Sequence, residues 1–187
     1  MRALSDRQTH DIPRPIGNTG YVEKVAAQQL FVVVALFRPV DVGAIFDRRE
    51  WPAHVTLASN FAVTDHGEGL ARAVSKGCAD YEQLSVRFAA PAMFGRDPTV
   101  PVQLVESADL HEMHERLADL LEVMPGFAAA DPDYWRAGYR PHMTQVPTVT
   151  VRDGDIKQMA HVAVAALTEN TATVISALAL SHEPHGV

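Results

Sequence analysis

Residues 51–57 read Trp-Pro-Ala-His-Val-Thr-Leu, and residues 139–145 read Tyr-Arg-Pro-His-Met-Thr-Gln. Each segment holds a histidine and a threonine separated by one apolar residue, in a run typical of a β-strand. Successive side chains of a strand point to opposite faces, so the histidine and threonine of each motif should share one face. The two motifs lie 88 residues apart. They suggest a site built from two matching halves.

An internal repeat follows from the same spacing. A shift of 88 residues also superposes four further pairs, which are Val63 on Val151, Asp65 on Asp153, Val74 on Val162 and Val86 on Val174. The expected order of elements matches as well: a motif strand, a helix and a strand. We therefore expect an α+β fold of two lobes related by an approximate two-fold axis. Two antiparallel sheets should line a central cleft, with helices outside.

Hydrophobic periodicity predicts the individual elements. Residues 30–37 form an unbroken apolar run rich in β-branched side chains, which indicates a buried central strand. Further strands are expected over 53–61, 84–89, 100–105, 139–146 and 173–181. Helices are expected over 67–79, 109–123 and 155–167, and 40–50 is a further candidate helix. Residues 129–138 should form a loop.

Composition and charge limit the class of protein. The chain has 187 residues, of which 47% are hydrophobic, enough for a substantial core. Its net charge of −7 argues against binding duplex DNA or long nucleic acid non-specifically, although a short nucleotide needs only local contacts. The longest apolar run is too short to span a bilayer. We expect a cytoplasmic monomer that does not bind membranes.

Domain organisation is expected to be simple. Residues 1–20 are polar, contain Pro and Gly, and do not resemble a secretory signal, so we expect a flexible tail. Residues 21–187 should form a single bilobal domain. Cys78 is the only cysteine, and its place in an expected helix favours a small core residue over a nucleophile.

Paired histidines suit acid–base chemistry on a phosphate ester. Imidazole has an ordinary pKa of about 6.5, so one ring can accept a proton from water while another protonates a leaving oxygen. Threonine hydroxyls can donate hydrogen bonds to the non-bridging oxygens. The candidate catalytic residues are His54 and His142, with Thr56 and Thr144 as phosphate binders. The alternative for either histidine alone is an ordinary strand residue.

The two motif segments resemble the paired motifs of the 2H phosphoesterase superfamily, which includes the LigT-like 2′-5′ RNA ligases and RNA 2′,3′-cyclic phosphodiesterases. The resemblance extends to Phe94-Gly95 before a strand, to the helix with His111 and His114, and to the last strand. It implies a bilobal α+β fold and metal-independent phosphodiesterase chemistry without a cofactor. Gln145 stands where that family usually has an apolar residue. It should face away from the site, so the departure bears on the substrate more than on the chemistry.

Other residues near the second motif have two interpretations each. Arg140 lies two residues before His142, so it either shares the cleft face and binds phosphate or is a surface arginine at a strand end. Tyr134, Trp135 and Tyr139 either stack on a base or cover an edge of the core. Trp51, before the first motif, has the same alternatives.

The remaining histidines give no metal signature. His111 and His114 are three residues apart, whereas zinc ligands of the His-Glu-x-x-His helix are four apart. We expect both on a solvated helix face, and we expect no metal site.

The sequence therefore predicts a phosphodiesterase that opens a 2′,3′-cyclic phosphate or cleaves a 2′-5′ link on a small nucleotide or RNA end. The alternatives are a nucleotide-binding module without catalysis and an RNA ligase on the same fold.

Overall fold

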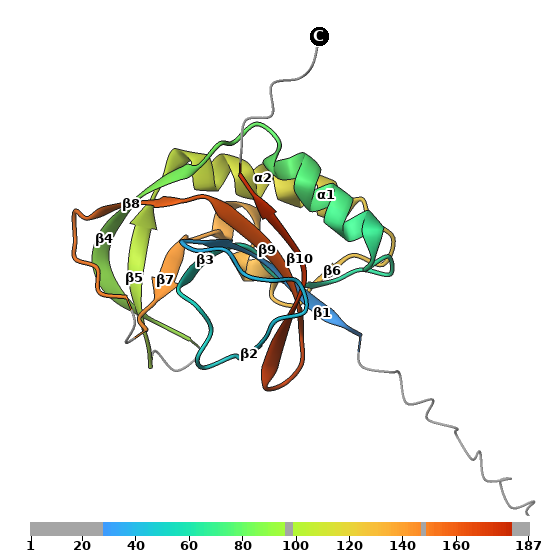
Figure 1. Ribbon diagram of the computed structural model, residues 1–187, viewed down its shortest axis with the longest axis horizontal. Helices are drawn as coiled ribbons and strands as arrows, with labels where there is room; N and C mark the ends of the chain where they lie inside the picture. Colours follow the sequence, from blue (N-terminus) through green and yellow to red (C-terminus); the bar gives the residue numbers. More distant parts are fainter. Residues whose placement is uncertain (1–27, 96–98, 147–148, 181–187) are drawn as a thin grey trace, which may run out of the picture.

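The computed structural model describes residues 28–95, 99–146 and 149–180. Two antiparallel sheets and two α-helices lie within these ranges, which confirms the predicted α+β class (Figure 1). The predicted tail of residues 1–20 lies outside the described residues. Neither α-helix in the described ranges is long and apolar enough to cross a membrane.

The larger sheet has six strands and the smaller has four. In spatial order the larger contains β2 (Ile45–Asp47), β10 (Thr171–Ala179), β9 (His161–Leu167), β1 (Leu30–Leu36), β3 (His54–Ala62) and β6 (Ala128–Ala129). The smaller contains β7 (His142–Thr144), β5 (Val100–Glu106), β4 (Leu84–Phe94) and β8 (Ile156–Met159). The motif strands β3 and β7 contact each other where the two sheets meet.

Strand β1 is buried on both faces, as the unbroken apolar run predicts. It lies between β9 and β3. Phe31, Val33 and Ala35 belong to the main core. Val32, Val34 and Leu36 belong to a smaller core on the opposite face of the sheet. The larger sheet is therefore packed on both sides around this strand.

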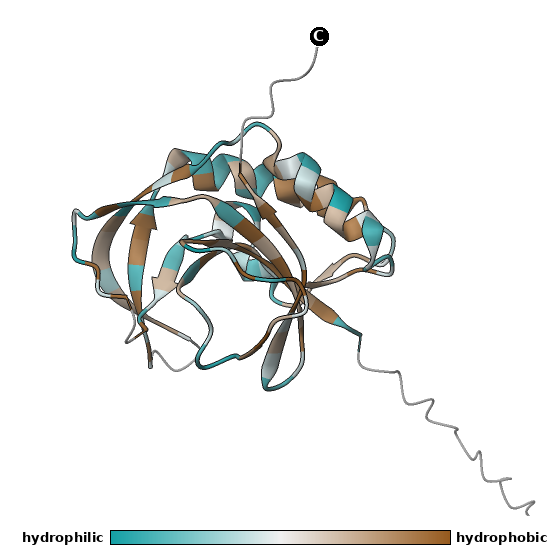
Figure 2. Ribbon diagram, in the orientation of Figure 1, coloured by the Kyte–Doolittle hydropathy of each residue, from teal (hydrophilic) through white to brown (hydrophobic). Residues whose placement is uncertain are grey.

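The helices α1 (Glu68–Cys78) and α2 (Ala108–Glu122) pack against each other over one side of the sheets (Figure 1). Helix α2 begins after Ser107, whose hydroxyl accepts a hydrogen bond from the Leu110 N–H at 3.4 Å. Cys78 is buried, as predicted. Figure 2 shows the apolar residues concentrated along the strands and on the sheet-facing side of the helices. This packing leaves the opposite side of the sheets for the site.

Two helix predictions are wrong. Residues 155–167 form β8 and β9, because β9 is covered on both faces and pairs with both β1 and β10. Residues 40–50 form turns and the short strand β2. The backbone N–H of Gly43 donates to the Val174 carbonyl at 2.8 Å, and the φ of Gly43 is +88°, which a helix does not allow.

The two halves of the chain exchange strands. Strand β4 follows the first motif but lies in the sheet of the second, and β9 and β10 follow the second motif but lie in the sheet of the first. The 88-residue alignment superposes β4 on β10, as predicted, but it fails between them, because α1 aligns with β8 and β9. The sheets are interlocked by the path of the chain.

His114 contradicts the prediction of a solvated helix face. Its side chain is 1% exposed. Its Nδ1 lies 2.7 Å from the Leu57 carbonyl, which can only accept, and its Nε2 accepts from the Arg136 backbone N–H at 2.9 Å. The ring is thus a neutral tautomer that ties α2 to β3 and to the turn at Arg136.

Two short 3-10 helices, Pro132–Tyr134 and Arg136–Gly138, lie in the predicted loop.

We predict that His114 makes the fold sensitive to acid. Burial lowers the pKa of His114 below its ordinary 6.5, so the unfolded chain binds this proton more readily. The contribution of His114 to the free energy of unfolding should be fully present above pH 6.5 and should decrease as the pH falls below that value. Urea unfolding should show that His114→Gln lowers the free energy of unfolding by about 2–3 kcal/mol at high pH. The free energy of unfolding of this variant should also depend less steeply on pH. An unchanged pH dependence would contradict this, and His66→Asn, at an exposed loop histidine, is the control.

Candidate active site

Buried apolar residues orient both motifs. Val55 is 0% exposed and Met143 is 1% exposed, and both side chains lie in the main core. Strand alternation therefore turns the flanking histidine and threonine of each motif to the other face. In register, His54 and Thr56 lie opposite Leu36 and Val34, which belong to the smaller core. The motifs face away from the helices, as the sequence predicts.

Tyr139 connects the two motif strands. Its hydroxyl donates to the Thr56 carbonyl at 2.8 Å, although Tyr139 comes from the segment that leads into β7. Its ring stacks on His114, with centroids 4.0 Å apart and planes 6° apart. Burial raises the pKa of Tyr139, so the phenol stays protonated and keeps donating. This bond fixes the first motif relative to the second.

Both motif histidines make the same main-chain contact. The Nδ1 atom of His54 lies 2.7 Å from the Pro52 carbonyl, and that of His142 lies 2.8 Å from the Arg140 carbonyl. A carbonyl only accepts, so each Nδ1 carries a hydrogen. The contact leaves Nε2 of each neutral ring with a free lone pair. Each imidazole is therefore prepared to accept or donate a proton at Nε2.

An aromatic ring covers each motif histidine. Trp51 lies against His54 with ring centroids 4.6 Å apart, and Phe94 lies against His142 at 4.4 Å. Both pairs are inclined by 52°. The surroundings of the two rings match closely, even though the elements around them do not follow the repeat. The local likeness of the motifs thus survives in the structure.

The pKa of each motif histidine lies below the ordinary value. For His54 the main cause is burial, which outweighs the Pro52 carbonyl bond, and the neighbouring His142 lowers the pKa further. For His142 burial again comes first, and the Arg140 guanidinium also lowers the pKa. Both rings therefore favour the neutral form at neutral pH.

The motif side chains line one cleft with two adjoining compartments. The first, of about 190 Å³, has His54, Thr56 and Thr144 in its wall. The second, of about 440 Å³, has His142, Arg140 and Thr56 in its wall. Since Thr56 lines both, the structure brings all five predicted catalytic and phosphate-binding residues together.

Two arginines of the cleft were not predicted from the sequence. Arg48 lines both compartments and Arg49 lines the first. They follow β2 in a segment predicted as a candidate helix, where exposed arginines carry no distinctive signal. Arg140 lies in the second compartment with its guanidinium carbon 5.0 Å from the centroid of Phe94.

The predicted aromatic residues have different places. Trp135 is 6% exposed and packs against Phe61 and Phe127, so it covers the core and is not available to stack on a base. This corrects its inclusion among the candidate stacking residues. Tyr134 and Tyr139 line the second compartment. Gln145 is exposed and lines neither compartment.

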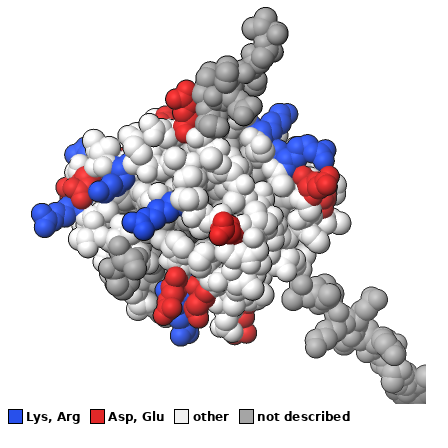
Figure 3. All heavy atoms as spheres, viewed as in Figure 1, with Lys and Arg blue, Asp and Glu red and all other residues white. Residues whose placement is uncertain are grey.

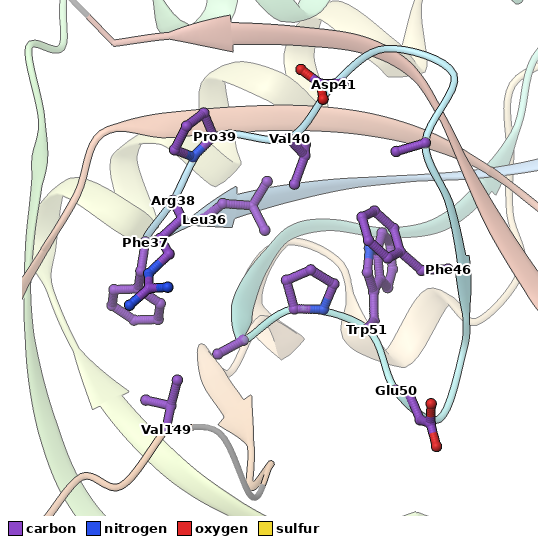
Figure 4. A pocket seen from close by; sticks show the side chains of 13 residues that line it. Leu36, Phe37, Arg38, Pro39, Val40, Asp41, Phe46, Glu50, Trp51 and Val149 are labelled. Atoms are coloured by element: carbon purple, nitrogen blue, oxygen red, sulfur yellow. The ribbon is translucent and has the colours of Figure 1, made fainter.

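A larger cavity of about 650 Å³ lies beyond Trp51 (Figure 4). Figure 4 shows Leu36, Val40 and Trp51 around it, with Arg38 projecting beside Phe37. Neither motif histidine lines it. Trp51 lines both this cavity and the first compartment, so the two spaces share this residue.

Within the described residues, no group of three or more His, Cys, Asp or Glu side chains is arranged to hold a metal ion. The described residues in the walls of the two compartments offer histidine, hydroxyl and guanidinium groups, and none of these described residues carries a carboxylate. Such walls suit an anion, and the paired imidazoles can move protons to and from it.

We predict that both motif imidazoles titrate below pH 6.5 in the free protein, as their lowered pKa values require. Heteronuclear NMR should report the Nδ1–H tautomer in both neutral rings. In His142→Asn the pKa of His54 should rise, because a neighbour that disfavours its charge is removed. An unchanged His54 pKa in that variant would show that the rings do not interact.

Comparisons relate the chain to known proteins. A model of the 2'-5' RNA ligase superfamily matches residues 39–183. The protein TT0787 of Thermus thermophilus is 17% identical with a TM-score of 0.49, over 83% of this chain and 100% of that chain. E. coli LigT complexed with 3'-AMP is 15% identical with a TM-score of 0.47, over 82% and 98%. No curated protein matches the chain. Because the family model spans most of the sequence, including both motifs, this chain belongs to the 2'-5' RNA ligase superfamily.

Proposed function

We propose that this protein is a metal-independent phosphodiesterase of the 2H type. It hydrolyses a 2′,3′-cyclic phosphate, or cleaves a 2′-5′ link, on a small nucleotide or an RNA end. The observation that carries the proposal is the matched pair His54 and His142, each with its Nδ1 bonded to a main-chain carbonyl and both bordering one cleft. Family membership supports the same chemistry.

The reaction needs one neutral and one protonated imidazole. Nε2 of the neutral ring takes a proton from water as the water oxygen bonds to phosphorus. Nε2–H of the other ring gives its proton to the ribose oxygen as the bond from that oxygen to phosphorus breaks. The product is a phosphate monoester with a free ribose hydroxyl, and exchange with solvent restores both rings. The matched surroundings of the two histidines let either act as the base.

Thr56, Thr144 and Arg140 hold the phosphate in this scheme. The two hydroxyls donate to non-bridging oxygens, and the guanidinium neutralises charge that develops there. Thr56 is well placed for this because it lines both compartments. The described wall residues offer N–H and O–H groups, which suit a phosphate, rather than the carboxylate oxygens that a divalent cation prefers.

Substitution of the two motif histidines tests the proposal. We expect His54→Asn and His142→Asn each to lower kcat for adenosine 2′,3′-cyclic phosphate by about 10²- to 10⁴-fold, because each removes one proton-transfer group. Asparagine retains a short donor toward the carbonyl that holds the ring. Thr56→Ala and Thr144→Ala should each lower kcat by roughly 10²-fold. Turnover should persist in EDTA. The rate of hydrolysis is measured by chromatography of the phosphate monoester that forms.

The control is His66→Asn, whose histidine is exposed before α1 and lines neither compartment. Full activity in both motif variants, with folding verified by circular dichroism, would overturn the proposal. Nucleotide binding without turnover in the unaltered protein would instead indicate a binding module. Joining of 2′,3′-cyclic phosphate and 5′-hydroxyl RNA ends in preference to hydrolysis would indicate a ligase.

The pH dependence of the reaction should show the lowered pKa values. In the free enzyme the acid limb of kcat/KM reports protonation of the base, and the alkaline limb reports loss of the proton from the acid. Since both imidazole pKa values lie below 6.5, we expect a bell-shaped profile whose maximum also lies below pH 6.5. Initial rates at low substrate concentration across the pH range measure this. A maximum near a pH of about 8 would show that other groups control the reaction.

A further inference from the structure

The cleft carries positive charge on a protein of net charge −7. Among the residues that the structure describes, three arginines and no aspartate or glutamate line its two compartments. By contrast, Figure 3 shows acidic and basic side chains scattered over the face of the molecule viewed there. One reacting phosphodiester carries a single negative charge, so three guanidinium groups provide more cations than it requires. The excess suggests a second anionic group on the ligand.

Arg48 is positioned by the turn between β9 and β10. Its backbone N–H donates to the Asn170 carbonyl at 3.0 Å, and its Nη1 donates to the Thr168 carbonyl at 3.3 Å. A carbonyl leaves the charge of a guanidinium uncompensated, and the other N–H groups of the fork remain for a ligand. Among the described residues, no carboxylate forms an ion pair with Arg48, Arg49 or Arg140.

The two acidic residues nearest in sequence are directed elsewhere. The Asp47 carboxylate accepts the backbone N–H of Arg49 at 2.8 Å. Glu50 lines the separate cavity beyond Trp51, and Figure 4 shows its carboxylate pointing away from that cavity. The charge of the arginine pair Arg48 and Arg49 is therefore available at the cleft.

The three arginines are not equivalent in position. Arg140 lies in the compartment of His142, Arg49 lies in that of His54, and Arg48 lines both. Arg140 serves the reacting phosphate from the His142 side, and the pair Arg48 and Arg49 adds two further cations on the His54 side.

We propose that Arg48 and Arg49 bind a second phosphate of the substrate, the group on the ribose O5′. This inference rests on the proposed function, because it takes the reacting phosphate to be on the 2′ and 3′ oxygens. O5′ is then the remaining ribose oxygen that can carry a phosphate. In an RNA end the same position holds the diester to the preceding nucleotide. The preferred substrate thus carries a 5′ phosphate group, and the arginine pair selects it.

Binding of stable ligands tests this independently of turnover. Adenosine 3′,5′-bisphosphate and adenosine 3′-phosphate differ only in the 5′ group, and calorimetry can compare their Kd values on the full-length protein. We expect the bisphosphate to bind about tenfold more tightly, and we expect Arg48→Gln/Arg49→Gln to abolish that preference. The matched control is Arg72→Gln, at an exposed arginine of α1 that pairs with Glu68. The control should retain the preference.

Equal binding of the two ligands by the unaltered protein would overturn the inference, as would an equal loss of preference in Arg72→Gln. A preference that survives in Arg48→Gln/Arg49→Gln would also overturn it. Hydrolysis with no 5′-phosphate preference would reject this inference and leave the proposed function intact. A 5′-phosphate preference in binding without any hydrolysis would reject the proposed function alone.

A second pair of ligands identifies the form of the phosphate. A dinucleotide with a 3′-terminal phosphate presents the 5′ group of its last nucleotide as a diester, whereas the bisphosphate presents a monoester. Tighter binding of the dinucleotide would point to RNA ends, and tighter binding of the bisphosphate would point to mononucleotides. Weaker binding of both than of adenosine 3′-phosphate would contradict a second phosphate site.

Discussion

The residue between histidine and threonine determines the geometry of the whole site. Val55 and Met143 are enclosed in the core beneath the helices, so neither motif strand can shift by one residue without burying an imidazole and exposing an apolar side chain. The same register places each histidine over the carbonyl two residues earlier in the chain. Core packing thus sets the tautomer of the reacting groups, and the chemistry of the cleft depends on hydrophobic contacts on the far side of the sheets.

Much of this arrangement could be predicted from the sequence because it depends on local patterns. Alternation in the two motifs gave the correct face for His54 and His142, and the unbroken run at residues 30–37 identified the central strand. Helices α1 and α2 followed from apolar residues at helical spacing. In each of these cases the neighbours in sequence also decide the environment in space.

The errors arose where distant partners decide the outcome. Residues 161–167 are rich in alanine and valine, a composition that suits a buried helix as well as a strand, and pairing with β1 and β10 selected the strand. His114 is in a helix as expected, but its burial depends on Leu57 and Arg136, which sequence spacing does not relate to it. Arg48 reaches the cleft through the turn at Thr168 and Asn170, which lies more than a hundred residues away.

The exchange of strands between the halves has a consequence for how the chain is made. As synthesis proceeds from the N-terminus, β1 and β3 emerge early, but β9 and β10 complete their sheet only after nearly the whole of the second half has been translated. Throughout that interval β1 has one unpaired edge and apolar side chains on both faces, the kind of surface that aggregates. The nascent protein therefore stays exposed to aggregation for a long interval, and the sheet around His54 is complete only near the end of translation.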